Sequence, residues 1–442
     1  MFQKIVNLAL IGIFVFLFVS PTNTTHAQDP EPWIITVNDV RDLPDFAQNS
    51  VCDAEYSTPG EQCTLRAAIH EANLCTDAEC PGGVIIQVPY MSIWLTNSGA
   101  NEDLGITGDL DIHNVAGKQI VIEGLPGGRP LISGNGQDRV FDILGGPVVL
   151  RNLWLVLGRL EATESNPSQT GAGIRNSGIL ELSDVILEDN QINCLPADQT
   201  NCYQAVGGGI VNYGTLTINM STIRLNKAAR GGGIFQTGGA GDLRIYNTSF
   251  YDNTATQNGG ALVSYDTTSI INSTISNNNA LQANGGIVNN AILYLANVTI
   301  ASNSSNYSGG ANLANEGTLN IRNTIIAYPN GPLGVVNCQS GGTWNSSGYN
   351  LYSDASCPAS GSGDVTNTDP KLTELTDWGG WNWTRGLLQG SPAHDRRPGF
   401  CTEFNTGYTV TTDQRGHNRD AMCDIGAFEG LISKVYLPAV RR

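Results

Sequence analysis

The middle of this chain repeats itself about every 25 residues, and this repeat limits the folds that are open to it. Each copy begins with a glycine-containing pair and continues into a short apolar strand. A chain that repeats at this period is typical of a solenoid, in which each coil buries its apolar face only against its neighbours. The six copies begin at Gly171, Gly207, Gly231, Gly259, Gly285 and Gly309.

A second strand motif follows each glycine pair at a fixed offset. Its apolar residue falls at Ile186, Ile223, Phe250, Ile275, Ile300 and Ile326. The apolar positions alternate as in a strand, and no helical period is present. The sequence therefore predicts an all-β fold, a right-handed parallel β-helix that runs without interruption from about Gln119 to Ala327. These six residues are expected to form one internal stack.

Asparagine ends the second strand in four copies, at Asn226, Asn253, Asn278 and Asn303. Asparagine tolerates a left-handed backbone and bonds its own main chain, which suits a corner. Stacked coils would place these side chains in ladders. The Asn-x-Ser/Thr triplets follow the same repeat, so we interpret them as corners and not as glycosylation sites. They begin at Asn219, Asn247, Asn272 and Asn297.

The first 27 residues are typical of a secretory signal peptide. Lys4 precedes an apolar stretch from Ile5 to Val19, and Thr25-His26-Ala27 suits cleavage before Gln28. An uncleaved anchor is the alternative. No later stretch approaches the ~20 apolar residues of a membrane span. The mature chain is thus expected to be secreted, in the extracellular space or attached to the cell surface. Its net charge of −17 argues against binding to nucleic acid.

All ten cysteines follow the signal segment and form local groups. Export, an even count and local grouping favour disulfides over zinc, and no CxxC spacing occurs. We expect Cys194 to pair with Cys202, Cys338 with Cys357, and Cys401 with Cys423. The pairing among Cys52, Cys63, Cys75 and Cys80 stays open.

Both ends depart from the repeat and are expected to cover the exposed strand edges of the solenoid. In Cys63–Asn73, Leu65, Ala68, Ile69 and Ala72 form one apolar helix face. This helix is predicted to lie over the first coil, with His70 and Glu71 toward solvent.

The same segment, CTLRAAIHEAN, resembles the CSLREA motif at the front of bacterial secreted β-helix proteins. Thr64 replaces the serine of the motif, and Ala67 replaces its glutamate. The C-terminal part resembles a choice-of-anchor domain of type Q, and the repeats resemble those of polymorphic outer-membrane proteins. The matching C-terminal runs are Asp369–Leu372, Gly390–Ala393, Asp413–Gly416 and Asp424–Glu429. The resemblance implies an N-terminal cap and the first coils in 28–118, parallel β-helix repeats in 119–335, a loop-rich choice-of-anchor domain in 336–430 and a tail in 431–442.

A catalytic set is hard to find in the sequence. The chain has no histidine between His113 and His394, which excludes a polygalacturonase-like set from the central coils. Arginines and aspartates on neighbouring coils are candidate lyase groups, but charges spaced in this way usually lie on solvated faces. They are Arg224, Arg230, Arg244, Asp252 and Asp266. We therefore expect a non-catalytic extracellular adhesion or surface protein whose long side binds glycans or other cell surfaces. The alternative is a carbohydrate-active enzyme, such as a pectate-lyase-like polysaccharide lyase, that acts on acidic polysaccharide.

Two groups of residues are candidate binding sites. Acidic residues at Glu102, Asp103, Asp109 and Asp111 offer oxygen ligands to Ca²⁺, the one cofactor that the sequence suggests. The alternative for them is a solvated turn. Trp378, Trp381 and Trp383 are candidates for stacking on sugar rings, or for a small core. Asp413, Arg415, Arg419 and Asp424 are expected to form ion pairs that order the C-terminal part.

Overall fold

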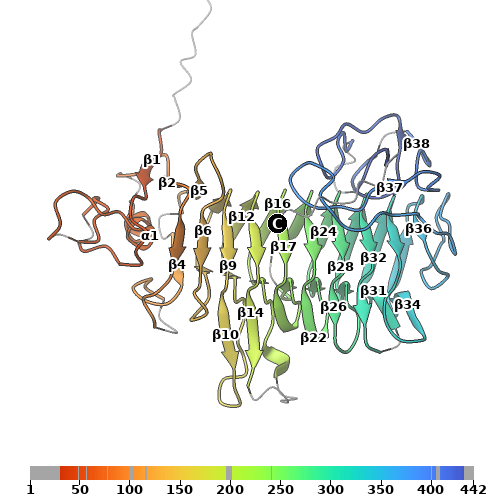
Figure 1. The fold of residues 1–442 in the computed structure, drawn as a ribbon, viewed down its shortest axis with the longest axis horizontal. Helices are drawn as coiled ribbons and strands as arrows, with labels where there is room; N and C mark the ends of the chain where they lie inside the picture. Colours follow the sequence, from red (N-terminus) through yellow and green to blue (C-terminus); the bar gives the residue numbers. More distant parts are fainter. Residues whose placement is uncertain are drawn as a thin grey trace, which may run out of the picture.

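The computed structural model describes residues 30–432, except 48, 56, 77, 100–102, 115–116, 196–201, 240, 308, 400 and 405–408. The predicted signal segment and most of the tail therefore lie outside the described residues. Parallel strands stack along one axis (Figure 1). Helix α1 lies at one end of the stack, and β36 lies at the other. The fold is the predicted parallel β-helix.

Four parallel sheets form the β-helix within these residues, and a typical coil adds one strand to each in turn. Sheet A contains β1 (Trp33–Thr36), β2 (Val84–Val88), β5 (Ile120–Gly124), β8 (Val148–Arg151), β12 (Ile179–Ser183), β16 (Thr215–Asn219), β20 (Leu243–Tyr246), β24 (Thr268–Ile271), β28 (Ile292–Ala296), β32 (Thr318–Arg322) and β35 (Thr343–Ser346). Sheet B contains β3 (Ser92–Trp94), β6 (Leu131–Ser133), β9 (Trp154–Val156), β13 (Ile186–Glu188), β17 (Thr222–Arg224), β21 (Ser249–Tyr251), β25 (Thr274–Ser276), β29 (Thr299–Ala301), β33 (Ile325–Ala327) and β36 (Leu351–Tyr352).

The chain passes from sheet B to sheet D and returns through the glycine turn to sheet C. Sheet D contains β10 (Arg159–Ala162), β14 (Gln191–Cys194), β18 (Lys227–Arg230), β22 (Thr254–Asn258), β26 (Asn279–Ala280) and β30 (Ser304–Ser305). Sheet C contains β4 (Leu110–Ile112), β7 (Phe141–Ile143), β11 (Ile174–Asn176), β15 (Ile210–Asn212), β19 (Ile234–Gln236), β23 (Leu262–Ser264), β27 (Ile287–Asn289), β31 (Gly309–Asn315) and β34 (Val335–Ser340). The β-helix thus extends beyond both ends of the predicted range.

The expected internal stack is confirmed for its last five members. Ile223, Phe250, Ile275, Ile300 and Ile326 lie in register on neighbouring strands and are buried. The prediction is wrong for Ile186, which lies in register with Thr222 and is partly exposed, whereas Leu187 aligns with Ile223 and is buried. Adjacent apolar residues in the Val185–Leu187 run left the register open, and a slip of one residue moves a side chain to the other face.

Asparagine side chains form the predicted ladder along the corner between sheets B and D. Asn226 Nδ2 donates to Asn253 Oδ1 at 3.0 Å, and Asn253 Nδ2 donates to Asn278 Oδ1 at 2.8 Å. The same bond links Asn278 to Asn303 at 2.9 Å, and Asn190 extends the row. The ladder satisfies buried main-chain groups at each corner.

The Asn-x-Ser/Thr triplets also lie at corners, between sheets A and B. Asn247, Asn272 and Asn297 adopt positive φ there, while Met220 takes that conformation in place of Asn219.

Helix α1 (Leu65–Leu74) covers the first coil as predicted, with Thr64 as its N-cap and with Leu65 and Ile69 buried. The expected exposure of His70 and Glu71 is wrong, because both side chains are buried. Flanking loops enclose the second face of the helix: Glu71 accepts from the backbone nitrogens of Asn49 and Ser50, and His70 Nε2 lies 2.8 Å from the carbonyl oxygen of Gly105.

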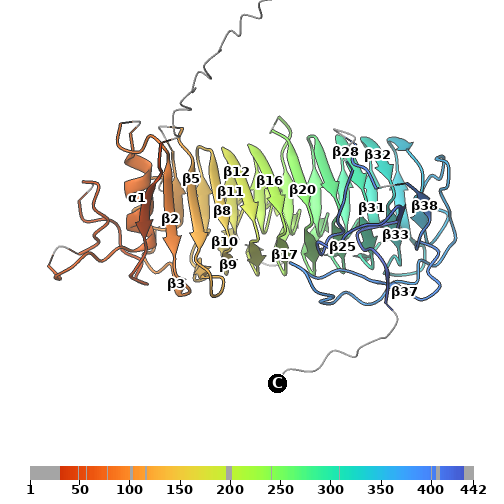
Figure 2. The same ribbon diagram turned by 90° about the horizontal axis from the view of Figure 1, so that it is seen from above.

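The C-terminal residues divide into two parts. A loop after β36 covers the last coil, where Asp354 accepts from Asn337 N and Asp364 accepts from Asn350 N. The remainder, 369–432, which we call the C-terminal segment, folds back along the side of the β-helix instead of capping it (Figures 1 and 2). It contains β37 (Leu387–Leu388), β38 (Arg397–Pro398), β39 (Met422–Cys423) and β40 (Leu431–Ile432). Within the described residues, no helix is long and apolar enough to cross a membrane.

All ten cysteines are paired within local stretches of the chain. The bridges are Cys52–Cys63, Cys75–Cys80, Cys194–Cys202, Cys338–Cys357 and Cys401–Cys423. The second of these stabilises the end of α1, the third lies beside the 3₁₀ turn η1 (Cys202–Gln204), and the fifth lies in the C-terminal segment.

Candidate functional site: the sheet C groove

The outward side chains of sheet C change in character along the β-helix. Successive strands present Asp111, Asp142, Arg175, Val211 and Phe235 in one row, because β4, β7, β11, β15 and β19 pair in register. The first three are charged, while the fourth and fifth are apolar. The coils nearest the N-terminus therefore carry charged side chains at the position where the later coils carry buried apolar side chains.

Two adjoining cavities lie over this row and share Arg175. Their volumes are about 680 Å³ and 590 Å³. Residues 163–170, between β10 and β11, contribute to the lining of both. We call the combined depression the sheet C groove. Its charged half is lined by Asp103, Asp109, Asp138, Arg139, Arg159 and Glu161, and its aromatic half by Tyr213, Arg230 and Phe235.

Arginines in the charged half are already engaged by the protein. Arg139 Nη1 lies 2.5 Å from Asp109 Oδ2, and Arg139 Nε donates to the carbonyl oxygen of Gly171. Arg175 is paired with Asp142, and Arg159 Nη2 lies 3.0 Å from Asp189 Oδ2. Protein carboxylates therefore neutralise all three guanidinium groups.

Asp138 is the most perturbed acid of the groove. Burial, assisted by the charge of Asp109, raises the pKa of Asp138 to about 6. Burial also raises the pKa of Asp109, although the Arg139 guanidinium opposes that shift. Asp138 Oδ2 is buried without a hydrogen-bond partner among the described residues. The Asp138 carboxyl group thus takes up a proton in mildly acidic solution.

The predicted calcium ligands do not come together as a set. Glu102 lies outside the described residues, and Asp109 pairs with Arg139. Asp103 and Asp111 instead approach Asp142, with one oxygen of each within 4.8 Å of the others. Arg139 and Arg175 both contact Asp142, so protein cations already supply the positive charge that Ca²⁺ would bring.

The aromatic half of the groove combines rings with a cation. The Arg230 guanidinium lies 5.0 Å from the centre of the Phe235 ring, and Phe235 lies 5.6 Å from Tyr265. Tyr213, which follows β15 and lines this half, is 42% exposed, and Tyr265, which follows β23 and borders this half beside Phe235, is 41% exposed. Exposed tyrosine rings beside a cation provide flat apolar faces with polar edges, which suit sugar rings.

The three candidate tryptophans have different surroundings. Trp378 packs against the core of the C-terminal segment, where its Nε1 donates to Thr373 Oγ1 at 3.2 Å. Trp381 and Trp383 are 41% and 39% exposed, and Trp383 stacks on Tyr251 of β21. Only Trp381 and Trp383 therefore present substantial ring surface to solvent.

The other charged candidates are dispersed. Arg224 pairs with Glu188 on sheet B, Arg244 pairs with Asp242 beside sheet A, and Arg230 lines the groove. Within the C-terminal segment, Arg415 pairs with Asp413 and Arg419 pairs with Glu429, each pair being largely buried. These last pairs order the segment.

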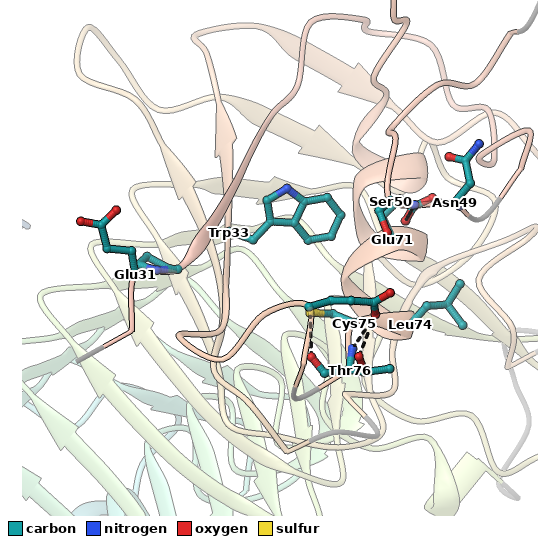
Figure 3. Close-up of a pocket in the computed structure, with 10 residues that line it drawn as sticks. Glu31, Trp33, Asn49, Ser50, Glu71, Leu74, Cys75 and Thr76 are labelled. Atoms are coloured by element: carbon teal, nitrogen blue, oxygen red, sulfur yellow. Dashed lines mark hydrogen bonds between the residues drawn. The ribbon is translucent and has the colours of Figure 1, made fainter. Parts of the chain in front are cut away.

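A further cavity of about 780 Å³ lies at the N-terminal end, between α1 and the start of β1 (Figure 3). Figure 3 shows the Trp33 ring facing the helix that carries Glu71 and Leu74. Glu71 and Glu79 are already hydrogen-bonded to backbone nitrogens, of Asn49, Ser50 and Thr76. The cavity offers acidic walls whose hydrogen bonds maintain the cap, so the sheet C groove is the stronger candidate.

Four charged residues of the groove were not predicted from the sequence: Asp138, Arg139, Asp142 and Arg175. Asp142 and Arg175 were nevertheless detectable as departures from the repeat, because later copies have valine or phenylalanine at the same strand position. Asp138 and Arg139 lie in a turn before β7, outside the repeated strand motifs, so the repeat gives no indication of them.

The fold defines a parallel β-helix protein with a lateral C-terminal segment. No protein-family model matches the chain, and no curated protein matches it, so the resemblance of its ends to the CSLREA and choice-of-anchor families stays a prediction. Among solved structures, the chain is similar to XylC in complex with xylose, with 12% identity, a TM-score of 0.44, and coverage of 80% of this chain and 67% of the other. It is also similar to pectate lyase Pel9A, with 13% identity, a TM-score of 0.44, and coverage of 89% and 97%. Structural similarity at this low sequence identity gives no information about the chemistry of this chain.

Proposed function

We propose that this protein is a secreted, non-catalytic carbohydrate-binding protein whose sheet C groove takes a neutral polysaccharide chain. The observation that carries the proposal is the pairing of exposed tyrosine rings with a polar wall in which Arg139, Arg159 and Arg175 are each paired with a carboxylate. The five disulfides support function outside the cytosol, where such bridges persist.

Charge favours a neutral ligand over an acidic one. A uronate carboxylate entering the groove would meet Asp103, Asp138 and Glu161, while each arginine there is held by a carboxylate or by main-chain oxygens. Hydroxyl groups, in contrast, both donate and accept hydrogen bonds and fit such mixed polar walls. This selectivity disfavours the alternative of an enzyme acting on acidic polysaccharide.

The ion pairs of the groove arginines also support binding without catalysis. A lyase requires a free base beside cations that acidify the proton next to a uronate carboxyl group. Arg139, Arg159 and Arg175 of the charged half are paired with carboxylates, and burial raises the pKa of the Asp138 carboxyl group to about 6. Asp138 therefore defines the second candidate function, a glycoside hydrolase in which its carboxyl group donates a proton to the leaving oxygen while a second carboxylate of the groove, Asp103 or Glu161, activates the water that attacks the anomeric carbon.

Calorimetric titration of the full chain with cellohexaose, xylohexaose, mannohexaose and hexagalacturonate tests the proposal. We expect at least one neutral hexasaccharide to bind, and hexagalacturonate to bind at least tenfold more weakly. Replacing Tyr213 and Tyr265 together with alanine should weaken binding about tenfold, or about 1.4 kcal/mol. The control is Tyr90→Ala, because Tyr90 is exposed and lies before β3, outside the groove.

Product analysis separates binding from catalysis. Prolonged incubation with each polymer should release neither reducing ends nor unsaturated product. New reducing ends that disappear in Asp138→Asn would establish the hydrolase instead, and tight binding of hexagalacturonate would overturn the neutral-ligand proposal.

A further inference from the structure

The outer face of sheet B is covered over only part of its length. Among the described residues, hydrogen bonds from the C-terminal segment to this face begin at Ser221 and Ser249, which both contact Asn382. They continue at Thr274, whose Oγ1 bonds Gln414 Oε1 at 2.6 Å, and at Ser276. In Figure 2, the segment lies beside β25 and β33, while β9 is farther along the sheet. The edge of the C-terminal segment therefore stands above the outer face of sheet B at β21, and we call this edge the step.

A connected set of side chains leads up to this step. Trp154 Nε1 on β9 donates to Glu188 Oε2 on β13 at 2.9 Å. Arg224 on β17 donates to the same oxygen at 2.8 Å through Nη2, and to the Tyr251 hydroxyl on β21 at 2.9 Å through Nη1. The Tyr251 ring stacks on Trp383, with ring centres 5.3 Å apart and planes 4° from parallel. We call these five residues the sheet B platform.

The platform is fixed in position and still accessible. It extends over four consecutive coils, or about 14 Å at ~4.8 Å per coil. Trp154, Glu188 and Arg224 are each partly exposed, and Trp383 is 39% exposed although one of its faces lies against Tyr251. Because the side chains hold one another, a ligand meets them with little loss of conformational freedom.

We propose that the sheet B platform is a second carbohydrate site, which binds a short stretch of a neutral polysaccharide. Sugar rings stack with their C–H faces on Trp383 and Trp154. Between the two indoles, Glu188 accepts hydrogen bonds from ring hydroxyls, and Arg224 donates to them. The opposite charges of Glu188 and Arg224 cancel, which again favours a ligand without charge.

This inference rests on the proposed function only for its ligand class, since its residues are separate from those of the groove. Two sites on different sheets would allow one molecule to hold two polysaccharide chains, or two parts of one chain. Simultaneous engagement raises the overall affinity for a polymer above that of either site.

The test is the number of hexasaccharides that each chain binds. Titration calorimetry with cellohexaose, xylohexaose and mannohexaose uses the wild type, Trp383→Ala, and the Tyr213→Ala/Tyr265→Ala double variant. We expect two equivalents of the hexasaccharide that binds for the wild type, one for Trp383→Ala, and for the tyrosine variant one equivalent at unchanged affinity and one weakened about tenfold. A change of indole fluorescence on binding should be lost in Trp383→Ala. The control is Trp94→Ala, because Trp94 is exposed on β3 of the same sheet and lies outside the platform.

A second variant tests the site without changing the C-terminal segment, where replacement of Trp383 could disturb the packing. Glu188→Gln keeps an acceptor for Trp154 and lies away from the C-terminal segment, and it should weaken the second site at least fivefold. One equivalent that is unchanged in Trp383→Ala and in Glu188→Gln would overturn the second site and leave the groove proposal standing. One equivalent that is lost in Trp383→Ala but kept in the tyrosine variant would uphold the platform and overturn the groove. No binding to any of these hexasaccharides would overturn both.

Discussion

Buried polar side chains at the corners bond each coil of this protein to the next. In the asparagine ladder, Asn253 uses both ends of its amide: Nδ2 bonds Ile223 O and Asn278 Oδ1, and Oδ1 accepts from Asn226 N and Nδ2. A buried donor or acceptor left without a partner costs about 1–3 kcal/mol. The ladder therefore fixes each corner relative to the next coil.

Asp138 is the residue at which pH should alter stability. Its pKa of about 6 in the folded protein exceeds the value of about 3.9 expected for the unfolded chain. The folded state therefore binds this proton more tightly. The contribution to stability is greatest below about pH 4 and is lost as the pH rises through about 6.

Replacing Asp138 with asparagine should consequently stabilise the protein at about pH 8 by roughly 1–3 kcal/mol and have little effect near pH 4. Thermal unfolding of both proteins at the two pH values measures the difference. Asp103→Asn serves as a control, because Asp103 is exposed at the edge of the same groove. An equal shift at both pH values would show that Asp138 does not carry the effect.

At the scale of the elements, α1 is enclosed on two sides. One face packs on the first coil through Leu65 and Ile69, and the other holds surrounding loops through buried polar groups. Arg66 of α1 holds these loops in place. It pairs with Asp42 at 2.6 Å, and it donates to the carbonyl oxygens of Gly105, Gly108 and Asp109.

Replacing Leu65 and Ile69 together with aspartate should cost several kcal/mol and cause aggregation, because it places two charges in the contact with the first coil. Glu71→Ala should cost about 1–3 kcal/mol, since two backbone nitrogens lose their acceptor. Thermal unfolding and light scattering provide the measurements.

The matched control for the helix is Leu74→Ala, which changes an exposed residue near its C-terminus. If the double variant stays monomeric with an unchanged melting temperature, α1 is not a cap.

At the scale of the whole molecule, the C-terminal segment is held against the side of the β-helix by buried polar contacts. Gln414 lies at the centre of the contact: its Nε2 donates to Ser249 Oγ at 2.8 Å and to Asn382 Oδ1 at 2.5 Å, and its Oε1 accepts from Thr274 Oγ1. Arg419 adds a bond from Nη2 to Asn272 Oδ1 at 2.7 Å.

Gln414→Ala should therefore loosen the segment before the β-helix unfolds, because Ser249, Asn382 and Thr274 each lose a buried partner, at about 1–3 kcal/mol in total. Limited proteolysis should cleave within 369–430 at least several-fold faster, while the circular dichroism of the strands is retained. Asn345→Ala, an exposed change on β35, should leave the rate unchanged. Cleavage that begins within the coils would contradict this arrangement.

The amino-acid sequence alone determined the β-helix, its central repeat, the five members of the inner stack, the asparagine ladder and the capping helix. The physical reason is that residues one repeat apart become neighbours in space, so a pattern along the chain states the contacts directly. Of the candidate sites, the sequence indicated Arg224, Trp383 and Asp109 individually but not their partners.

Tertiary structure decided what the repeat does not encode. Whether Ile186 or Leu187 faces inward depends on a one-residue register that adjacent apolar residues leave open. His70 and Glu71 are buried by loops far from them in sequence. The groove pairs Arg139 with Asp109 across 30 residues, and the platform joins Tyr251 to Trp383 across more than a hundred. Such contacts arise only when folding brings non-repeating segments together, so they follow from packing and not from periodicity.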